Sequence, residues 1–362
     1  MQKGHGGLED YRMENNEVKP KTKRTSTIKI SLNEISEATK KSMKTRTITS
    51  IVLAIIAVPA LFLGGWYFLA FVFFVSIIAV FEIMRGTKIS KRYWYVYFLT
   101  IISTLALTFW IFIKNNVSAN IAANHPWWDV SKWVVENGFE SIQVSSFLLA
   151  TILTGLFVLI VFDPHISFSV AAYLFLLVLF AGFGFQAFLF LRLYPQYIAD
   201  IPETTYNPTI ITSAFLICYV ILGTTMNDIG AYFVGVLFGK NKMVPRISPN
   251  KTWEGFFGGV LFSVLLSFLF AMIVAWAGHP VLPFLSHKEW YYLLLLSAIM
   301  PLAANIGDLF FSATKRHLEV KDYGSIIVGH GGILDRIDSL LMVSMVTAML
   351  IILINNGWSI LV

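Results

Sequence analysis

The sequence predicts an all-α polytopic membrane protein with about nine transmembrane helices, an N-terminus in the cytoplasm and a C-terminus outside. Three observations predict this fold. Hydrophobic residues make up 56% of the 362 residues and charged residues only 13%, against roughly 25% charged in a soluble domain. Nine apolar segments reach the about 17–25 residues that a helix needs to cross the hydrocarbon core. Lys and Arg residues cluster beside alternate ends of these segments.

The nine predicted spans follow one another with polar connections of varying length. Only Gly64 and Gly65 separate the first two, so this is the least marked division in the chain. We place the spans at residues 48–64, 66–84, 93–113, 146–162, 168–191, 209–226, 253–277, 289–306 and 335–354.

The positions of the Lys and Arg residues predict the orientation, because cytoplasmic loops carry an excess of positive charge. With a cytoplasmic N-terminus and nine alternating spans, all but four of the 27 Lys and Arg residues fall on the cytoplasmic side. The exceptions are Lys114, Lys132, Arg192 and Lys288. Since a hydrophilic stretch precedes the first span, we expect no cleavable signal peptide.

Three regions are expected along the chain. Residues 1–47 are basic and predicted to be a disordered cytoplasmic tail, residues 48–208 form N-terminal transmembrane helices, and residues 209–362 form a catalytic transmembrane region with a site facing the cytoplasm. The net charge of +6 lies beside spans and indicates contact with membrane lipids rather than nucleic acid. We expect a multi-pass integral membrane protein, in the cell membrane if its source is bacterial. The single Cys218 excludes an intramolecular disulfide.

The first chemical motif lies at the end of the eighth span. Asp308, Ser312, Lys315 and Arg316 share one face of a helix, because they are spaced by four, three and one residues. Lys315 and Arg316 alone could be interfacial cations that snorkel to the headgroups. A carboxylate directly after a long apolar run is costly, however, so Asp308 indicates a functional site and a metal ligand.

The second motif opens the ninth span. Gly331 and Gly332 let the backbone approach a bulky anion, and the helix start that follows presents free N–H groups to phosphate. Asp335 and Asp338 lie three residues apart on one face of this helix. One Asp there could simply favour the helix dipole. Two of them next to a Gly-Gly turn favour the binding of a hard cation such as Mg²⁺.

The third motif precedes the seventh span. Asp228 lies after an apolar run, and Ser248-Pro-Asn-Lys251-Thr252 reads as a helix start with Ser248 or Thr252 as the cap. Lys251 does not suit a first helical turn unless it meets an anion, so we predict that it binds phosphate. Acids and cations gathered at one membrane face are typical of metal-assisted phosphoryl or nucleotidyl transfer.

These motifs resemble the signature of phosphatidate cytidylyltransferases (CDP-diacylglycerol synthases), which runs Ser-x-x-Lys-Arg-x₄-Lys-Asp-x-Gly and then His-Gly-Gly-x-x-Asp-Arg-x-Asp. The matching residues are Ser312, Lys315, Arg316, Lys321, Asp322, Gly324, His330, Gly331, Gly332, Asp335, Arg336 and Asp338. The upstream segments 228–232 and 248–255 match as well. Ile229, Thr314 and Val328 depart from the residues usual in the family, and none of these departures removes a charged ligand.

The resemblance implies the reaction of CTP with phosphatidate to give CDP-diacylglycerol and pyrophosphate, in a membrane-embedded homodimer. It implies Mg²⁺ or Mn²⁺ on Asp308 and Asp335, with Asp228 and Asp338 as further candidate metal ligands and a second cation left open. The expected catalytic cations are Lys315, Arg316, Lys321 and Arg336. The expected substrate-binding residues are Ser248, Lys251, Thr252, Ser312, Asp322, His330, Gly331 and Gly332.

Two other functions stay open at this point. Another CTP-dependent lipid enzyme, such as a polyprenol kinase or a CDP-archaeol synthase, would share the metal site but use a different acceptor. A transporter would also explain acids in a membrane, but it would place them near the bilayer midplane on broken helices. The gathering of the acids at one membrane face favours an enzyme.

Overall fold

The computed structural model describes residues 37–86, 93–122, 141–164, 166–193, 210–283, 285, 287–324 and 331–355. Residues 42–362 form one compact unit, and residues 1–41 form a second one of which only the first helical residues are described. Residues 1–36 of the tail that was predicted to be disordered (1–47) therefore lie outside the described residues. So does His330, which was predicted to bind substrate.

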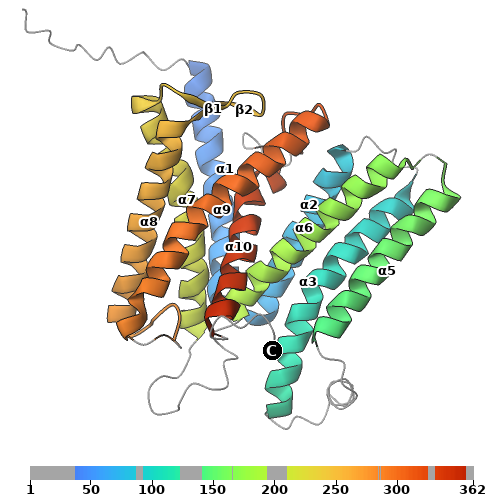
Figure 1. The fold of residues 1–362 in the computed structure, drawn as a ribbon, viewed down its shortest axis with the longest axis horizontal. Helices are drawn as coiled ribbons and strands as arrows, with labels where there is room; N and C mark the ends of the chain where they lie inside the picture. Colours follow the sequence, from blue (N-terminus) through green and yellow to red (C-terminus); the bar gives the residue numbers. More distant parts are fainter. Residues whose placement is uncertain are drawn as a thin grey trace, which may run out of the picture. The chain divides into compact units, whose positions relative to one another are not determined.

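Within these ranges the chain forms nine α-helices and one two-stranded hairpin (Figure 1). Each predicted span falls on one of these helices. The helices are α1 (Glu37–Leu63), α2 (Gly65–Gly86), α3 (Trp94–Ala122), α5 (Ser141–Phe162), α6 (Phe168–Leu193), α7 (Ile210–Phe238), α8 (Trp253–Trp276), α9 (Trp290–His317) and α10 (Leu334–Asn355). The strands are β1 (Lys242–Val244) and β2 (Ser248–Thr252).

The predicted all-α membrane architecture is confirmed in its coarse form. Six of the described helices, namely α2 and α6–α10, are long and apolar enough to cross a membrane. The described apolar parts of α1, α3 and α5 are shorter, at 10–17 residues. All nine helices nevertheless carry the long apolar runs from which the spans were predicted.

Several helices extend beyond their predicted spans, and in α1 and α7 the extension changes where a predicted feature lies. Helix α1 begins at Glu37 rather than near residue 48, because residues 37–47 contain good helix formers and no Gly or Pro. Helix α7 continues to Phe238 instead of ending near residue 226, since the residues after Asp228 are again apolar. Asp228 therefore lies inside a helix and not at its end.

Helices α9 and α10 stand between two buried clusters of apolar side chains. The first cluster joins α2, α3 and α6 to Phe311 of α9 and Leu334 of α10, and it includes Tyr323 from the connection between them. The second joins α6, α7 and α8 to the middle of α9 and α10. The two helices that carry most of the predicted site are thus packed on both sides.

Helix α8 meets α7 along a stripe of small residues. Gly255, Gly259, Ser263 and Ser267 are buried on this face, and the Ser263 hydroxyl donates to the carbonyl of Gly223 on α7 at 2.7 Å. The opposite face of α8 is exposed and apolar, as expected for a surface in contact with lipid.

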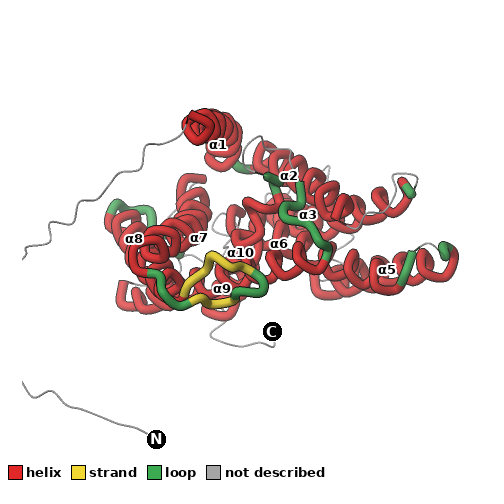
Figure 2. Tube along the Cα trace, turned by 90° about the horizontal axis from the view of Figure 1, so that it is seen from above, coloured by secondary structure: helices red, strands yellow, loops and turns green. Residues whose placement is uncertain are grey.

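Of the two helix caps predicted within Ser248–Thr252, the structure confirms Thr252 and excludes Ser248. These residues form β2, which pairs antiparallel with β1, and the hairpin lies over the end of α9 (Figure 2). Pro249 disfavours helical backbone at Ser248. The helix begins only at Trp253, where the Thr252 hydroxyl accepts from the Gly255 N–H at 3.2 Å. Lys251 therefore precedes the helix instead of lying in its first turn.

Glu254 ties the base of the hairpin to the start of α8. Its carboxylate accepts from the backbone N–H groups of Lys240 and Asn241 at 3.1 and 3.2 Å, and from the Asn241 side chain at 2.8 Å. The hairpin is therefore fixed at its root, and its strand β2 reaches toward α9.

The chain reverses direction after α9 through a tight turn. Glu319 takes a positive φ of 57°, and the Val320 N–H donates to the Lys315 carbonyl at 3.0 Å. This is the left-handed termination with which many helices end. It directs the following residues back toward the start of α10.

Candidate active site

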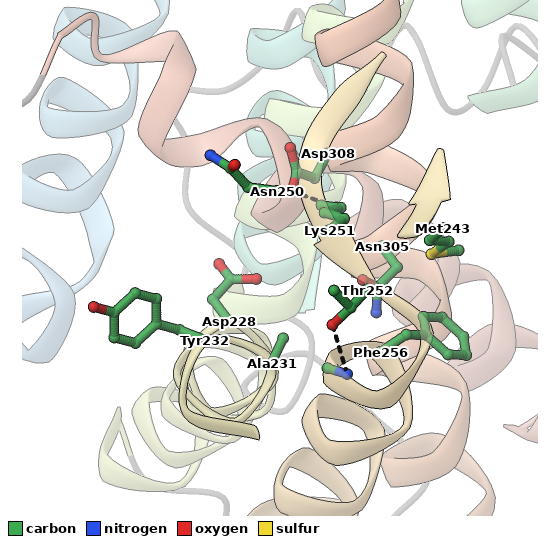
Figure 3. Close-up of a pocket in the computed structure, with 11 residues that line it drawn as sticks. Asp228, Ala231, Tyr232, Met243, Asn250, Lys251, Thr252, Phe256, Asn305 and Asp308 are labelled. Atoms are coloured by element: carbon green, nitrogen blue, oxygen red, sulfur yellow. Dashed lines mark hydrogen bonds and ion pairs between the residues drawn. The ribbon is translucent and has the colours of Figure 1, made fainter. Parts of the chain in front are cut away.

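A cavity of about 250 Å³ opens where the hairpin, α7, α8 and α9 meet (Figure 3). Asp228 of α7, Lys251 of β2 and Asp308 of α9 bring charge to its wall. Its polar lining is completed by Asn250, Thr252 and Asn305. The first and the third predicted motifs thus contribute neighbouring side chains, although they are distant from each other in the sequence.

Lys251 and Asp308 form an ion pair inside this cavity. The Lys251 Nζ lies 2.6 Å from Asp308 Oδ2, and the two side chains are 24% and 34% exposed. The Ser312 hydroxyl donates to Asp308 Oδ1 at 3.2 Å, as its spacing of four residues on the helix predicts. Lys251 therefore does meet an anion, and in this structure that anion belongs to the protein.

Two further carboxylates surround Asp308. Asp228 and Asp338 both lie within the electrostatic reach of its charge. The Asp228 side chain is exposed at the cavity and accepts from the Asn227 side chain at 3.4 Å. Asp338 is buried and accepts from the Ser339 N–H at 2.7 Å. Three acids are therefore gathered near Lys251, and the charges of Arg336 and Lys315 also reach Asp228 and Asp338, respectively.

Asp335 belongs to a second, more buried pair. Its Oδ1 lies 2.8 Å from Lys315 Nζ, and these side chains are 5% and 12% exposed. Its Oδ2 accepts from the backbone N–H groups of Tyr323 and Gly332, at 3.0 and 3.2 Å. Burial raises the pKa of the Tyr323 hydroxyl, so this neighbour of Lys315 stays neutral. Asp335 thus joins the end of α9 to both described ends of the 321–332 segment.

The remaining predicted residues surround these two pairs. The Arg316 Nε donates to the carbonyl of Ile247 at 3.3 Å and so contacts the hairpin turn. Gly331 takes a positive φ of 87°, as predicted for a turn built on glycine. Ser248 lies in β2 and is partly buried, and the side chains of Lys321, Asp322 and Arg336 are exposed around the site.

The acids have the chemistry that a hard cation requires, because they supply oxygen ligands at one place. Among the described residues, however, no three Asp, Glu, His or Cys side chains lie close enough to share one ion. Asp308 and Asp335 each face a lysine instead. The donor set therefore fits Mg²⁺ by its chemistry, whereas its present arrangement is one of carboxylate–lysine pairs.

One buried acid near the site was not among the predicted residues. Glu82 of α2 is 1% exposed, and its carboxylate accepts from the N–H groups of Ile333 and Leu334 at 3.0 and 2.8 Å. Its signal was present in the sequence, since Glu82 is the only charged residue in the predicted span 66–84. An acid in such a run is costly and usually has a function.

Comparisons with known proteins show which sequences this chain is similar to. The profile of the cytidylyltransferase family matches residues 44–354. The chain is similar to the phosphatidate cytidylyltransferase of Staphylococcus epidermidis, with 33% identity over 83% of this chain and 96% of the relative. It is 31% identical to that of Bacillus subtilis over 83% of this chain and 94% of the relative. The Staphylococcus haemolyticus protein of the same name is 32% identical, with coverages of 83% and 96%.

Proposed function

This chain belongs to the cytidylyltransferase family, and we propose that it transfers CMP from CTP to phosphatidate, giving CDP-diacylglycerol and pyrophosphate. It is then a nucleotidyltransferase of phospholipid synthesis, as its similar relatives are by name. The observation that carries the assignment is the Lys251–Asp308 pair, which joins two distant motifs in an open cavity. A polyprenol kinase, a CDP-archaeol synthase or a transporter is not favoured.

The reaction asks the protein for position and positive charge rather than for a base. The phosphate of phosphatidate is already an anionic nucleophile, and it must approach a second polyanion. Lys251 lines the cavity, Arg316 contacts the hairpin turn and Lys315 belongs to the neighbouring pair with Asp335. We propose that these three cations neutralise the triphosphate and the departing pyrophosphate. The exposed Lys321 and Arg336 add charge on the same side of the site, with Asp322 and His330 as further substrate-binding candidates.

We propose Mg²⁺ or Mn²⁺ as the cofactor. Asp308 and Asp335 would be its ligands, with Asp228 and Asp338 beside them. When bound, such an ion supplies a compact positive charge that polarises phosphate oxygens. We place a second cation beside Asp228 and Asp338, because both carboxylates lie within electrostatic reach of Asp308.

We also propose that all nine helices cross the membrane, with the N-terminus and the active site on the cytoplasmic side and the C-terminus outside. The clustering of Lys and Arg residues beside alternate helix ends supports this orientation. A homodimer is the expected assembly. Attaching a membrane-impermeant thiol label to single cysteines introduced near residues 5 and 360, in a Cys218→Ser background, tests the orientation, and equal labelling from outside at both ends would contradict it.

The experiment that tests the function uses the purified chain with labelled CTP and a panel of lipid phosphates. We expect labelled CDP-diacylglycerol with phosphatidate and little product with polyprenols or archaeal ether lipids. Transfer of the γ-phosphate with release of CDP would instead identify a kinase. Chelation of divalent ions should stop the reaction, and Mg²⁺ should raise the thermal midpoint of the wild-type protein but not of an Asp308→Asn variant.

A further inference from the structure

We propose that Glu82 is a positioning residue of the active site, although it lies on α2 in the half of the chain that carries no other predicted site residue. It fixes the start of α10 and the residues before it, so that Asp335 faces Lys315 and accepts from the Gly332 N–H. The expected effect of Glu82 on the rate rests on the proposed function. The expected effect on the position of the turn rests on geometry alone.

The Glu82 carboxylate occupies the N-terminus of α10. Its two oxygens accept separately from the N–H groups of Ile333 and Leu334, which have no partner within the helix. Both bonds join residues about 250 positions apart in the sequence. A carboxylate at this end is also favoured by the helix dipole. Glu82, a residue of α2, therefore caps the N-terminus of α10, and that N-terminus lies next to Asp335.

Two glycines of the signature form the walls around this carboxylate. At Gly332 the three atoms nearest to an added Cβ all belong to Glu82, the closest being Oε2 at 2.6 Å. At Gly324 the three nearest atoms also belong to Glu82, and Oε1 would overlap with the added carbon. A side chain at Gly324 or Gly332 would collide with Glu82 of α2. These two glycines therefore make room for Glu82, which is a different role from making room for substrate.

The same segment carries Asp335. The Gly332 N–H donates to Asp335 Oδ2, and the N–H groups of the next two residues donate to Glu82. One turn of backbone thus presents consecutive N–H groups to two different carboxylates. The hydrogen bonds to Glu82 hold this turn in the orientation that places Asp335 2.8 Å from Lys315.

A buried carboxylate in a membrane helix needs a strong reason to be there, since its desolvation is expensive. The backbone N–H groups supply part of the compensation, and Arg85 on the same helix contributes opposite charge. A purely apolar side chain could fill this space but would leave two N–H groups unsatisfied. The position therefore requires an acceptor with two oxygens.

The kinetic test replaces Glu82 with Gln, which has nearly the same shape but places an NH₂ group against one of the two N–H donors. We expect kcat for CDP-diacylglycerol formation to fall about 10- to 100-fold, with the KM for phosphatidate changing less than about 3-fold. The matched control is Arg192→Met, because Arg192 is also buried and also bonds the end of another helix, through the carbonyls of Leu61 and Phe62. Its folded fraction should keep a kcat near that of the wild type.

Amide hydrogen exchange of the full chain in nanodiscs gives a readout that does not depend on activity. In Glu82→Gln the amides of Ile333 and Leu334 should exchange about 10-fold faster or more, while Arg192→Met should leave this region unchanged. Unchanged exchange in Glu82→Gln would overturn the inference. A wild-type protein that makes no CDP-diacylglycerol would instead reject the proposed function, and exchange alone would then decide on Glu82.

A second pair of variants keeps the inference falsifiable if Glu82→Gln folds poorly. Gly332→Ala should be nearly inactive because its methyl group meets Glu82, and shortening that side chain with Glu82→Asp should make room for it. We expect the double variant to be at least about 5-fold more active than Gly332→Ala, so that the two changes are not additive. Additive losses would show that Glu82 does not set the position of this turn.

Discussion

The two lysine–carboxylate pairs of the site differ in almost every physical respect. Lys251–Asp308 lies in an open cavity and joins a hairpin to a helix, and the Ser312 hydroxyl donates to its carboxylate. Lys315–Asp335 is buried, and Asp335 also accepts from two backbone N–H groups. Behind this second pair stands Glu82, which bonds the same turn.

The two pairs should therefore behave differently: Lys251–Asp308 can exchange partners, whereas Lys315–Asp335 holds the site together. An exposed ion pair contributes about 0–1 kcal/mol to stability, so little is lost when a substrate replaces one partner. Breaking a buried pair from one side costs about 3–5 kcal/mol, because the other charge is left without compensation. We therefore expect the first pair to open when substrate binds. The second pair should maintain the geometry of the site in addition to its proposed part in binding metal and phosphate.

The largest effect is expected for Asp335→Asn, which attacks the buried pair. Activity should fall below about 1% of the wild type, and the thermal midpoint should fall by about 5 °C or more as Lys315 loses its partner. The measurement is the assay with labelled CTP together with thermal unfolding in the same detergent. A variant with a wild-type midpoint would remove the distinction between the two pairs.

Asp308→Asn should abolish activity to a similar extent but leave the protein as stable as the wild type. The carboxylate is 34% exposed and its lysine can turn to solvent, so the thermal midpoint should change by less than about 2 °C. Comparison of the two Asn variants isolates the effect of burial, since the chemical change is identical. Retention of more than a tenth of the activity at saturating Mg²⁺ would reject Asp308 as a ligand.

Lys251→Met should weaken the use of CTP more than that of phosphatidate. Loss of one charge-assisted contact of about 1.5–3 kcal/mol corresponds to roughly 10- to 150-fold in kcat/KM for CTP. Lys251→Arg should recover part of this loss. Equal losses for both substrates would point instead to a role of Lys251 in holding the hairpin over α9.

The smallest effect is expected for Ser312→Ala. The hydroxyl makes one hydrogen bond of 3.2 Å to Asp308 in a partly exposed place, so its loss should lower kcat/KM only about 3- to 10-fold. The stability of the variant should be unchanged in thermal unfolding. A loss as large as that of Asp308→Asn would mean that the hydroxyl itself binds substrate.

The sequence predicted the features that arise from local periodicity. Apolar runs of the right length located all nine helices, and the spacing of four residues placed Asp308 and Ser312 on one helix face, where they form a hydrogen bond. Phosphate binding by Lys251 stays a prediction, since Lys251 meets Asp308 in this structure.

Features that depend on distant contacts were not predictable in the same way. Ser248–Thr252 pairs with a strand that ends at Val244, and this pairing excludes Ser248 as the helix cap, whereas Thr252 does cap α8. Glu82 gains its meaning only when α2 packs against the start of α10. As a single acid in an apolar run, Glu82 could have been identified as a candidate functional residue. The local sequence does not indicate, however, that its carboxylate accepts from the N–H groups at the start of α10.

The open pair between Lys251 and Asp308 has a thermodynamic consequence for the affinities of the ligands that bind there. One ammonium group cannot neutralise Asp308 and a phosphate at the same time, so an anion that binds Lys251 frees the carboxylate. Any cation that binds the freed carboxylate in turn releases the lysine. By linkage each ligand then raises the affinity for the other by the same factor, so nucleotide and cation should bind cooperatively at this pair.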